Sequence, residues 1–324
     1  MPELRRKATV SGFSLLAVAL IAVTQLPPAF AAGPCPVASL FMWGSTGSGP
    51  GEFTQPFGVQ IAEDGYVYVT DQHNERVQVF NNAGALVTSW AIPLGLSGYA
   101  HPTGICVSNG VVWVSAHQGQ HVTRWSTTGT LLGYAATPPS GWFYPTAIAA
   151  SAAGDIFVCN SAANRIIRLN SSGAYLSEWS TGANPYGIDI DAAGDIYVGC
   201  YAPDNHVYKY SGSGGFLLSW GGLGAGPGQF LAAEGIAHDA AGDIYVCDTG
   251  NDRIQKFTSS GAYICSFGGV GTAMGQMDVP SDISIDPNGD LYVCEYANNR
   301  IQVFTFGAVP TMRSTWGSVK TQYR

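Results

Sequence analysis

Three acidic residues have the types and positions for metal chemistry: Asp189, Glu234 and Asp282. Each lies on or beside a short predicted strand and could face a central channel. Successive side chains of a strand point to opposite faces, so the offsets place Asp189 and Asp282 on one side of their strands and Glu234 on the other. The three carboxylates therefore either form one set or are separately solvated or paired locally.

Six histidines offer a second kind of metal ligand, and they are His73, His101, His117, His121, His206 and His238. A catalytic zinc ion takes three protein ligands and keeps one open position. Only His101 and His238 are expected near the innermost strands, and two histidines do not complete such a site. No Cys-x-x-Cys pair is present to support a structural zinc.

Aromatic residues gather where the same predicted strands begin. The group comprises Phe53, Phe57, Tyr99, Trp142, Phe143, Tyr144, Tyr186 and Phe230. Packing of glycine-rich linkers explains Phe53 and Phe230. Aromatic rings with a few polar neighbours suit a protein, peptide or glycan ligand. The candidate ligand-binding residues are Phe57, His101, Trp142, Tyr144 and Tyr186, together with His121 and His206.

A repeated unit of sequence positions these residues. Glu234–Gly269 predicts four short strands between Gly, Asn, Asp and Ser clusters, a pattern typical of a β-meander. Five further copies match it, at Gly58–Trp90, Gly104–Tyr134, Ala147–Trp179, Gly187–Trp220 and Asp282–Trp316. A period of roughly 40–50 residues with four strands per unit indicates the blades of a propeller.

The repeat resembles the NHL repeat. The resemblance is carried by Pro-x-Gly at the start of the unit, then Gly-Asp-Ile-Tyr-Val-x-Asp, then Asn-x-Arg-Ile-Gln-x-Phe. The linkers Trp43–Phe53, Trp220–Phe230 and Phe267–Met277 agree with it. The resemblance implies an all-β, six-bladed β-propeller with four-stranded antiparallel blades over residues 35–324. Propellers of this kind serve as binding platforms and as enzymes, so the fold alone does not give the function.

The resemblance also implies two enzymatic alternatives. An amidating-lyase relative would hold zinc with one inner histidine from each of three blades, but no histidine follows the opening proline in any copy. A lactonase-like relative would hold calcium with axial Glu, Asp and Asn side chains, for which Asp189, Glu234 and Asp282 are the candidates. A non-catalytic binding role is favoured, with a metal-dependent hydrolase or lyase in the axial channel as the alternative and calcium as its cofactor.

The first strand of each blade should line the central axis and the fourth should form the rim. The linkers between blades and the second turn of each blade should share one face, which we call the linker face, and propeller sites usually lie on such loops. Ser39–Trp43 is predicted to close the ring as a fourth strand of the last blade, with Met312–Trp316 as the alternative.

Two polar repeat positions are expected to be structural. The end of strand two carries Asp71, Asn160, Asp248 and Glu295, which should cap their own turns by accepting backbone N–H groups. The start of strand three carries Arg76, His121, Arg165, His206, Arg253 and Arg300, which should pair within their blades. His121 and His206 replace the arginine of the other copies, so we expect a specialised role in the second and fourth blades.

The seven cysteines divide into two groups. Cys159, Cys247 and Cys294 share a repeat position with Thr70, Ser115 and Gly199, so a small buried side chain is expected there. Equivalent positions in neighbouring blades lie too far apart for a disulfide. One disulfide is expected among the remaining cysteines, which are Cys35, Cys106, Cys200 and Cys265.

Composition and the first residues bear on location and partners. Arg5–Lys7, an apolar stretch at Phe13–Val23 and Ala29–Ala31 predict a signal peptide over residues 1–31, or an uncleaved anchor that would be the only contact with a membrane. The protein is therefore expected to be secreted or extracytoplasmic. The formal net charge of −8 argues against a nucleic-acid partner. The predicted partner is a protein, peptide or glycan at the linker face.

Overall fold

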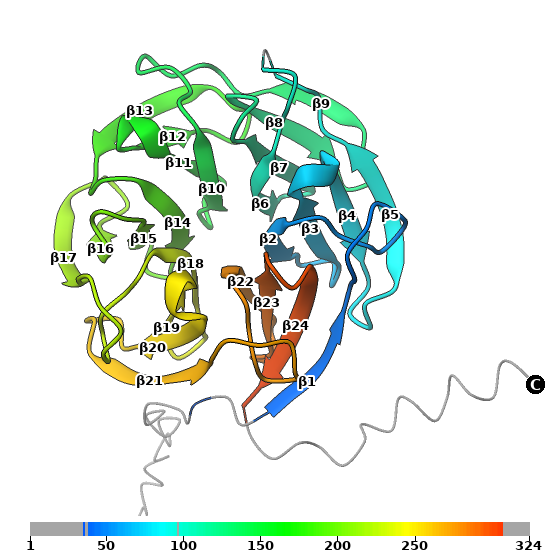
Figure 1. The fold of residues 1–324 in the computed structure, drawn as a ribbon. Coiled ribbons are helices and arrows are strands. Elements are labelled where there is room, and N and C mark those ends of the chain that lie inside the picture. Colours follow the sequence, from blue (N-terminus) through cyan, green and yellow to red (C-terminus); the bar gives the residue numbers. More distant parts are fainter. Residues whose placement is uncertain (1–34, 36–37, 96, 307–324) are drawn as a thin grey trace, which may run out of the picture. The chain divides into compact units, whose positions relative to one another are not determined.

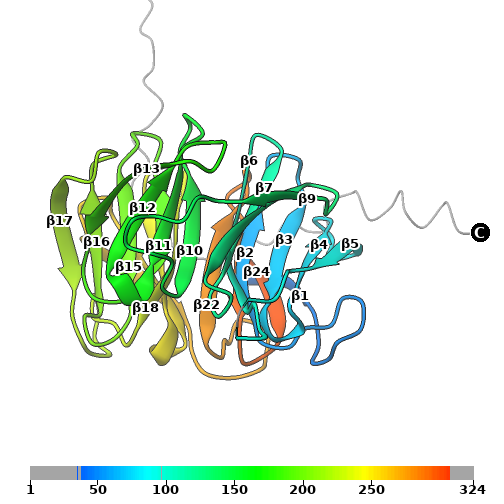
Figure 2. The same cartoon turned by 90° about the horizontal axis from the view of Figure 1, so that it is seen from above.

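The computed structural model describes residues 35, 38–95 and 97–306, and nearly all of their regular structure is β. Six four-stranded antiparallel sheets stand around a central axis over these residues, as the sequence predicted (Figure 1). The first strand of each sheet is innermost, and the strands run between the two faces of the ring (Figure 2). Across the same residues, no helix is long and apolar enough to cross a membrane.

The blades follow chain order. Blade 1 is β2 (Pro56–Ile61), β3 (Val67–Asp71), β4 (Arg76–Phe80) and β5 (Leu86–Ala91), and blade 2 is β6 (Pro102–Ser108), β7 (Val111–Ala116), β8 (His121–Ser126) and β9 (Leu131–Tyr134). Blade 3 is β10 (Pro145–Ala150), β11 (Ile156–Asn160), β12 (Arg165–Leu169) and β13 (Tyr175–Ser180), and blade 4 is β14 (Pro185–Ile190), β15 (Ile196–Cys200), β16 (His206–Tyr210) and β17 (Phe216–Gly221). Blade 5 is β18 (Ala233–His238), β19 (Ile244–Asp248), β20 (Arg253–Phe257) and β21 (Tyr263–Gly268). Blade 6 is β22 (Pro280–Ile285), β23 (Leu291–Glu295) and β24 (Arg300–Thr305). Short 3₁₀ turns follow strand two at Gln72–Asn74, Ser161–Ala163 and Thr249–Asn251.

The N-terminal strand closes the ring. β1 (Ala38–Trp43) pairs antiparallel with β24 and becomes the fourth strand of blade 6, which confirms the prediction for Ser39–Trp43. The alternative closing strand, Met312–Trp316, lies outside the described residues. β1 pairs with the outer edge of β24, so the last blade has four strands like the others and that edge of β24 is not left open.

The core lies between the blades. Strand two is buried along its whole length in every blade, apart from a half-buried first residue in blade 2, because neighbouring sheets cover both of its faces. Among the described residues, six apolar clusters each join two neighbouring blades. Strand four alternates between exposed and half-buried side chains at the rim, for example in β5. Burial between sheets supplies the main stabilisation of such a fold.

Close approach of the blades explains the small residues near the axis. A Cβ atom at Gly58, Gly104 or Gly187 would collide with the main chain of the next blade's first strand. The repeat position at Cys159 also faces that strand, and its thiol lies 3.6 Å from the Gly187 carbonyl oxygen. Cys159, Cys247 and Cys294 are fully buried free thiols, as predicted. The position therefore accepts only a short side chain.

The carboxylates that end strand two are structural, but their role differs from the prediction. Asp71 accepts the backbone N–H of Thr54 at 2.8 Å, and Asp248 accepts that of Leu231 at 2.8 Å. Both N–H groups belong to the preceding linker and not to the turn that follows the strand. Arg76 and Arg253 also donate to these carboxylates, at 2.8 and 2.7 Å. Each carboxylate thus ties a linker to its blade, and the predicted pairing of arginines within blades is confirmed.

A second set of hydrogen bonds joins one blade to the next. The residue that ends turn two has a left-handed backbone, and in blades 1, 3, 4, 5 and 6 its side chain accepts an N–H from the residue before the next blade's first strand. Asn205, with φ of 56°, accepts the Ala232 N–H at 2.9 Å, and Asn299, with φ of 53°, accepts the Gln55 N–H at 2.7 Å. Asparagine tolerates this conformation better than most residues. The second bond joins blade 6 to blade 1.

One disulfide forms among the cysteines that lie outside the shared repeat position. Cys35 is bonded to Cys265, with 6.1 Å between their Cα atoms. Cys106 and Cys200 are buried free thiols, and burial raises the pKa of each. The bond ties the segment before β1 to the rim strand β21, and thus to blade 5.

Candidate functional site

Aromatic and histidine side chains meet over the axis on the linker face. Phe57 of blade 1 and Tyr186 of blade 4 have ring centroids 6.2 Å apart. Blades 1 and 4 are opposite one another in the ring, so this contact spans the axis. Tyr296 contacts Phe57 at 6.3 Å and Tyr201 contacts Tyr186 at 5.3 Å. We call Phe57, Tyr186, Tyr201 and Tyr296 the aromatic arc.

A second group of rings completes the cluster over blades 1 to 3. His73 stacks on His101 and His117 stacks on Tyr144, each at 4.8 Å between centroids. In both pairs a residue of turn two contacts the residue before the next blade's proline. His101 and Tyr144 have φ of 46° and 51°, and this left-handed backbone is shared by the residue before the opening proline or alanine of the other blades.

Two histidines of this group, His73 and His117, are neutral at physiological pH. Burial lowers the pKa of His117 to about 4, with the neighbouring His101 as a smaller cause. Burial also lowers the pKa of His73, and His101 adds to that effect. These two rings consequently add no positive charge to the cluster over the axis.

Glu234 of β18 holds the repeat position that Phe57 and Tyr186 hold in blades 1 and 4, beside the aromatic arc. It is 6% exposed, and its carboxylate forms no hydrogen bond or ion pair within the described part of the chain. Burial raises its pKa to about 8, and the charge of Asp282 contributes. The Glu234 carboxylate in turn raises the pKa values of Tyr186 and Tyr296, after the larger effect of their burial. The charge of Glu234 therefore acts on both phenol groups.

The structure brings together Phe57, His101, Tyr144 and Tyr186 of the predicted ligand-binding residues, but not Trp142. Trp142 is 6% exposed and packs in the core between blades 2 and 3. It stands three residues before the opening proline, the same position as Phe53, Phe230 and Met277, which are fully buried linker anchors. The expectation that Trp142 belongs to the exposed group is therefore wrong.

His121 and His206 also stay outside the cluster. The Nδ1 atom of His121 lies 3.0 Å from the Gly119 carbonyl oxygen, and its ring packs against Tyr134 at the rim. His206 pairs with Asp204 at 2.8 Å, so it takes a partner within its blade as the arginines do. Asp204 also accepts from the Tyr208 hydroxyl and from the Ala183 N–H. In blade 4 this aspartate takes the place of the carboxylate that blades 1, 5 and 6 carry at the end of strand two.

Sequence reasoning missed His73, His117, Tyr201 and Tyr296, all of which lie in second turns. His117, Tyr201 and Tyr296 share one repeat position, the residue directly after strand two. An aligned comparison of that position shows a histidine or tyrosine in blades 2, 4 and 6. This signal is lost when the turn is regarded as a simple connection between strands.

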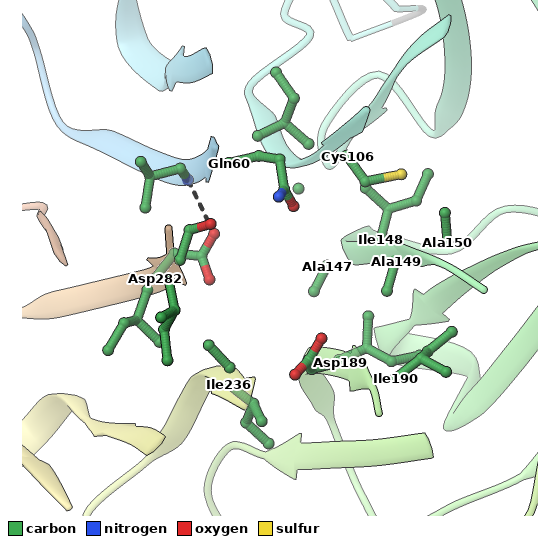
Figure 3. A pocket seen from close by; sticks show the side chains of 18 of the residues that line it. Gln60, Cys106, Ala147, Ile148, Ala149, Ala150, Asp189, Ile190, Ile236 and Asp282 are labelled. Carbon is green, nitrogen blue, oxygen red and sulfur yellow. Dashed lines mark hydrogen bonds between the residues drawn. The ribbon is translucent and has the colours of Figure 1, made fainter. Parts of the chain in front are cut away.

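A cavity of about 260 Å³ lies further along the axis, around the second half of the first strands. Gln60, Asp189 and Asp282 point into it from three blades (Figure 3). Its other walls are mostly aliphatic or small, and Glu234 does not line it. The predicted alternation is confirmed, because Asp189 and Asp282 share the cavity and Glu234 faces elsewhere.

The polar groups of this cavity are already engaged. Asp282 accepts the Val59 N–H at 2.9 Å, and burial raises its pKa to about 7. Asp189 lies 2.5 Å from the Nδ1 atom of His238, and this hydrogen bond raises the His238 pKa. Among the described residues, no group of three or more His, Cys, Asp and Glu side chains could hold a metal ion. Asp189, Glu234 and Asp282 therefore do not assemble the oxygen shell that calcium requires.

Comparisons with known proteins agree with the repeat. The family model for the NHL repeat matches residues 230–257 and 277–304. E3 ubiquitin-protein ligase TRIM71 of Rattus norvegicus is 42% identical over 43 residues, and the match covers 13% of this chain and 5% of that protein. The chain thus spans a small part of the length of this curated relative.

Solved structures share the fold at low identity. A streptogramin B lyase is 16% identical with a TM-score of 0.63, covering 83% of this chain and 98% of the lyase. A virginiamycin B lyase from Staphylococcus aureus is 17% identical with a TM-score of 0.57, covering 78% and 95%. A putative gluconolactonase is 16% identical with a TM-score of 0.62, covering 86% and 96%. Such likeness establishes the fold alone. With its repeats, its ring of six blades and the family match, the chain belongs to the NHL-repeat β-propeller family.

Proposed function

We propose that this protein is an exported, non-catalytic binding module whose linker face takes an extended basic segment of a protein partner. The observation that carries the proposal is the cluster of aromatic and histidine rings over the axis, in which Tyr144 and Tyr201 are 38% and 40% exposed. Aromatic side chains dominate the energetics of protein interfaces. NHL-repeat propellers serve widely as protein-interaction modules, and a role of that kind needs no catalytic group.

Exposed apolar side chains surround this cluster and extend the surface. The linkers present Leu94, Tyr99, Phe143, Leu223, Val270 and Met274, with exposed fractions of 59, 57, 48, 67, 68 and 55%. Single exposed apolar residues are common, but a group on one face of a propeller is typical of an interaction surface. The linker face thus offers apolar area on several sides of the ring cluster.

Charge favours a basic partner. The formal net charge is −8, and no lysine or arginine is part of the ring cluster as the structure describes it. Arg76, which lies on this face, is occupied, since it donates to the Ser48, Gly49 and Glu52 carbonyl oxygens as well as to Asp71. Complementary charge speeds association and selects among partners.

A peptide panel tests the proposal. Fluorescence anisotropy would compare labelled peptides rich in lysine and apolar residues with acidic and neutral peptides. We expect saturable binding of the basic peptides, and about tenfold weaker binding when Tyr144→Ser and Tyr201→Ser are combined. The control combines Tyr66→Ser and Tyr263→Ser, whose side chains are each 38% exposed away from the linker face. Equal loss in both variants, or binding of neutral oligosaccharides in place of peptides, would contradict the proposal.

A hydrolase or lyase in the axial cavity is the second candidate. The Asp189–His238 pair favours it, because a carboxylate that accepts from Nδ1 orients the ring and leaves Nε2 available to move a proton. Asp282 lines the same cavity and could act as the acid. Turnover of lactones, or elimination from cyclic depsipeptides, that disappears in His238→Ala would support this candidate, and activity unchanged in that variant would exclude the pair.

Export is the part of the proposal that concerns location. The Cys35–Cys265 disulfide supports it, because such bonds persist in oxidising compartments. Fractionation of the producing cells, with N-terminal sequencing of the recovered protein, would test it. Recovery of the full chain in the cytoplasm with a free Cys265 thiol would contradict it.

A further inference from the structure

A buried carboxylate beside an arc of aromatic rings needs a ligand to complete it. Glu234 occupies the position directly after the first residue of its strand, where the other blades carry Phe57, Thr103, Thr146, Tyr186 and Ser281. The threonines and the serine at this position donate to main-chain oxygens of neighbouring blades, for example Thr146 to the Pro185 carbonyl at 2.9 Å. The Glu234 side chain makes no such contact among the described residues.

The rings lie around this carboxylate on the side of blades 4 to 6. Phe57 and Tyr186 meet across the axis, Tyr201 extends the arc at blade 4, and Tyr296 extends it at blade 6. Blade 5, which carries Glu234, stands between blades 4 and 6 in the ring. The aromatic arc therefore bounds the same sector of the linker face that contains the Glu234 carboxylate.

The polar side chains of this sector remain available for hydrogen bonds to a ligand. Within the range that the structure describes, the hydroxyl groups of Tyr186, Tyr201 and Tyr296 form no hydrogen bond, and neither does the Glu234 carboxylate. A carboxylate without a partner is costly on a residue that is only 6% exposed, and proteins keep such groups where a ligand or a reaction uses them. Faces of aromatic rings beside a negative charge are the usual surroundings of a bound organic cation.

We propose that Glu234 and the aromatic arc bind an ammonium group, presented by a lysine, methylated lysine or N-terminal amine of the partner segment. This inference rests on the proposed function, because it names the chemical group that the linker face would recognise. The cation replaces the missing partner of Glu234 and lies against the faces of Phe57, Tyr186 and Tyr296. His73 and His117 are neutral, so these two rings do not repel the cation.

The surroundings of Glu234 give this site a defined dependence on pH. The titratable groups that act on it or respond to it are Tyr186 on β14, Cys247 on β19, Asp282 on β22 and Tyr296 after β23. Burial raises the pKa values of the two tyrosines and the cysteine, so these groups stay protonated and neutral at pH 6–9. Because the Glu234 pKa is raised to about 8, a cation that binds below that pH must displace a proton.

Tetramethylammonium is a suitable probe, because its charge does not change with pH and it needs no partner protein. An NMR titration of the purified protein would measure its affinity between pH 6 and pH 9. We expect the affinity to rise about tenfold per pH unit up to about pH 8 and then to level. tert-Butyl alcohol, which has a similar size and no charge, should bind at least about tenfold more weakly at pH 9.

Two variants separate the site from the rest of the surface. Glu234→Gln keeps the shape, and we expect it to lower tetramethylammonium affinity about tenfold at pH 9. It should also remove the part of the pH dependence that Glu234 causes, leaving only the part from Asp282, whose pKa is about 7. Glu63→Gln is the matched control, since Glu63 is exposed on a first turn at the opposite face. Equal binding by the wild type and Glu234→Gln, or equal binding of both probes, would overturn the inference. Ammonium binding with no peptide binding would sustain this site and overturn the proposed function instead.

Discussion

At the scale of single residues, the same repeat position does different work in different blades. Thr103, Thr146 and Ser281 use hydroxyl groups to hold a neighbouring blade, whereas Phe57 and Tyr186 cover the axis. The carboxylate at Glu234 fits neither use. Function in a repeat protein is most visible where one copy departs from the pattern that the fold requires.

The first prediction concerns the stability cost of that carboxylate. The ordinary pKa of a glutamate side chain is 4.5 and the pKa of Glu234 in the folded chain is about 8, so the folded state binds more protons between these values. Stability should therefore fall as pH rises from about 4.5 to about 8, by an amount on the order of 3 kcal/mol. Glu234→Gln should remove the part of this stability loss that the titration of Glu234 causes, as measured by urea unfolding at pH 5 and pH 8. An unchanged difference between the two pH values in the variant would contradict the account.

The surroundings of a residue were predictable where its position in the repeat indicated them. The burial of Cys159, Cys247 and Cys294 followed from one shared small position, and Tyr144 was assigned to the aromatic group because it stands at a blade entry. The stacking of His117 on Tyr144 and the contact of Asp189 with His238 each join neighbouring blades. Such contacts depend on how the sheets lie against each other, which no pattern within one copy specifies.

At the scale of elements, the second turns and the linkers fix the geometry of the linker face. The turns place a left-handed residue where it can hold the next blade, and the strand-two carboxylates hold the linkers. The strands and turns were predictable, since alternation and glycine spacing are local. The bond from each carboxylate to a linker 17 residues earlier was not, because it depends on the folded path of the chain, whereas local spacing points to the carboxylate's own turn.

The bond between blades 4 and 5 supplies the second prediction. Asn205 is 1% exposed, and its side chain accepts the buried Ala232 N–H. Asn205→Gly keeps the left-handed backbone but loses this hydrogen bond, and we expect a loss of about 1–2 kcal/mol in the free energy of unfolding. Asn205→Ala also carries the strain of that backbone, which adds about 1–2 kcal/mol. Urea unfolding of both variants measures the difference, and equal stability of Gly and Ala would contradict the assigned conformation.

A third prediction concerns the buried carboxylate at the end of β19. Asp248 is fully buried and receives hydrogen bonds from Arg253, Asn251, Gln255 and the Leu231 N–H. Asp248→Asn should destabilise the chain by about 3–5 kcal/mol, because it leaves the Arg253 charge without its counter-ion. Thermal unfolding measures this loss, and Glu63→Gln is the control at an exposed carboxylate. A similar change in both variants would show that the network contributes little.

At the scale of the whole molecule, connections that are distant in sequence hold the two ends of the ring together. β1 pairs with β24, Asn299 bonds to Gln55, and Cys35 is bonded to Cys265. The closing strand was predictable, because Ser39–Trp43 repeats the character of a fourth strand that has no blade before it. The partner of Cys35 was not, since four cysteines outside the shared position allowed several pairings.

The disulfide gives the fourth prediction. Its cysteines are 230 residues apart, and a bond across so long a loop restricts the unfolded chain strongly. Cys265→Ser should lower the free energy of unfolding by about 2–5 kcal/mol, and a reducing agent should lower the wild type to the same level while leaving the variant unchanged. Calorimetry with and without reductant measures both effects. A variant as stable as the oxidised wild type would contradict the contribution of this bond to ring closure.

The most direct measurement is a comparison of two faces by photo-crosslinking. A photoreactive phenylalanine analogue would replace Tyr144 on the linker face or Tyr66 on the opposite face, two tyrosines that are each 38% exposed. We predict that illumination with a saturating lysine-rich peptide labels the protein from position 144, that excess tetramethylammonium weakens the labelling, and that position 66 gives none. Equal labelling from both positions, or labelling from position 66 alone, would contradict the assignment of binding to the linker face.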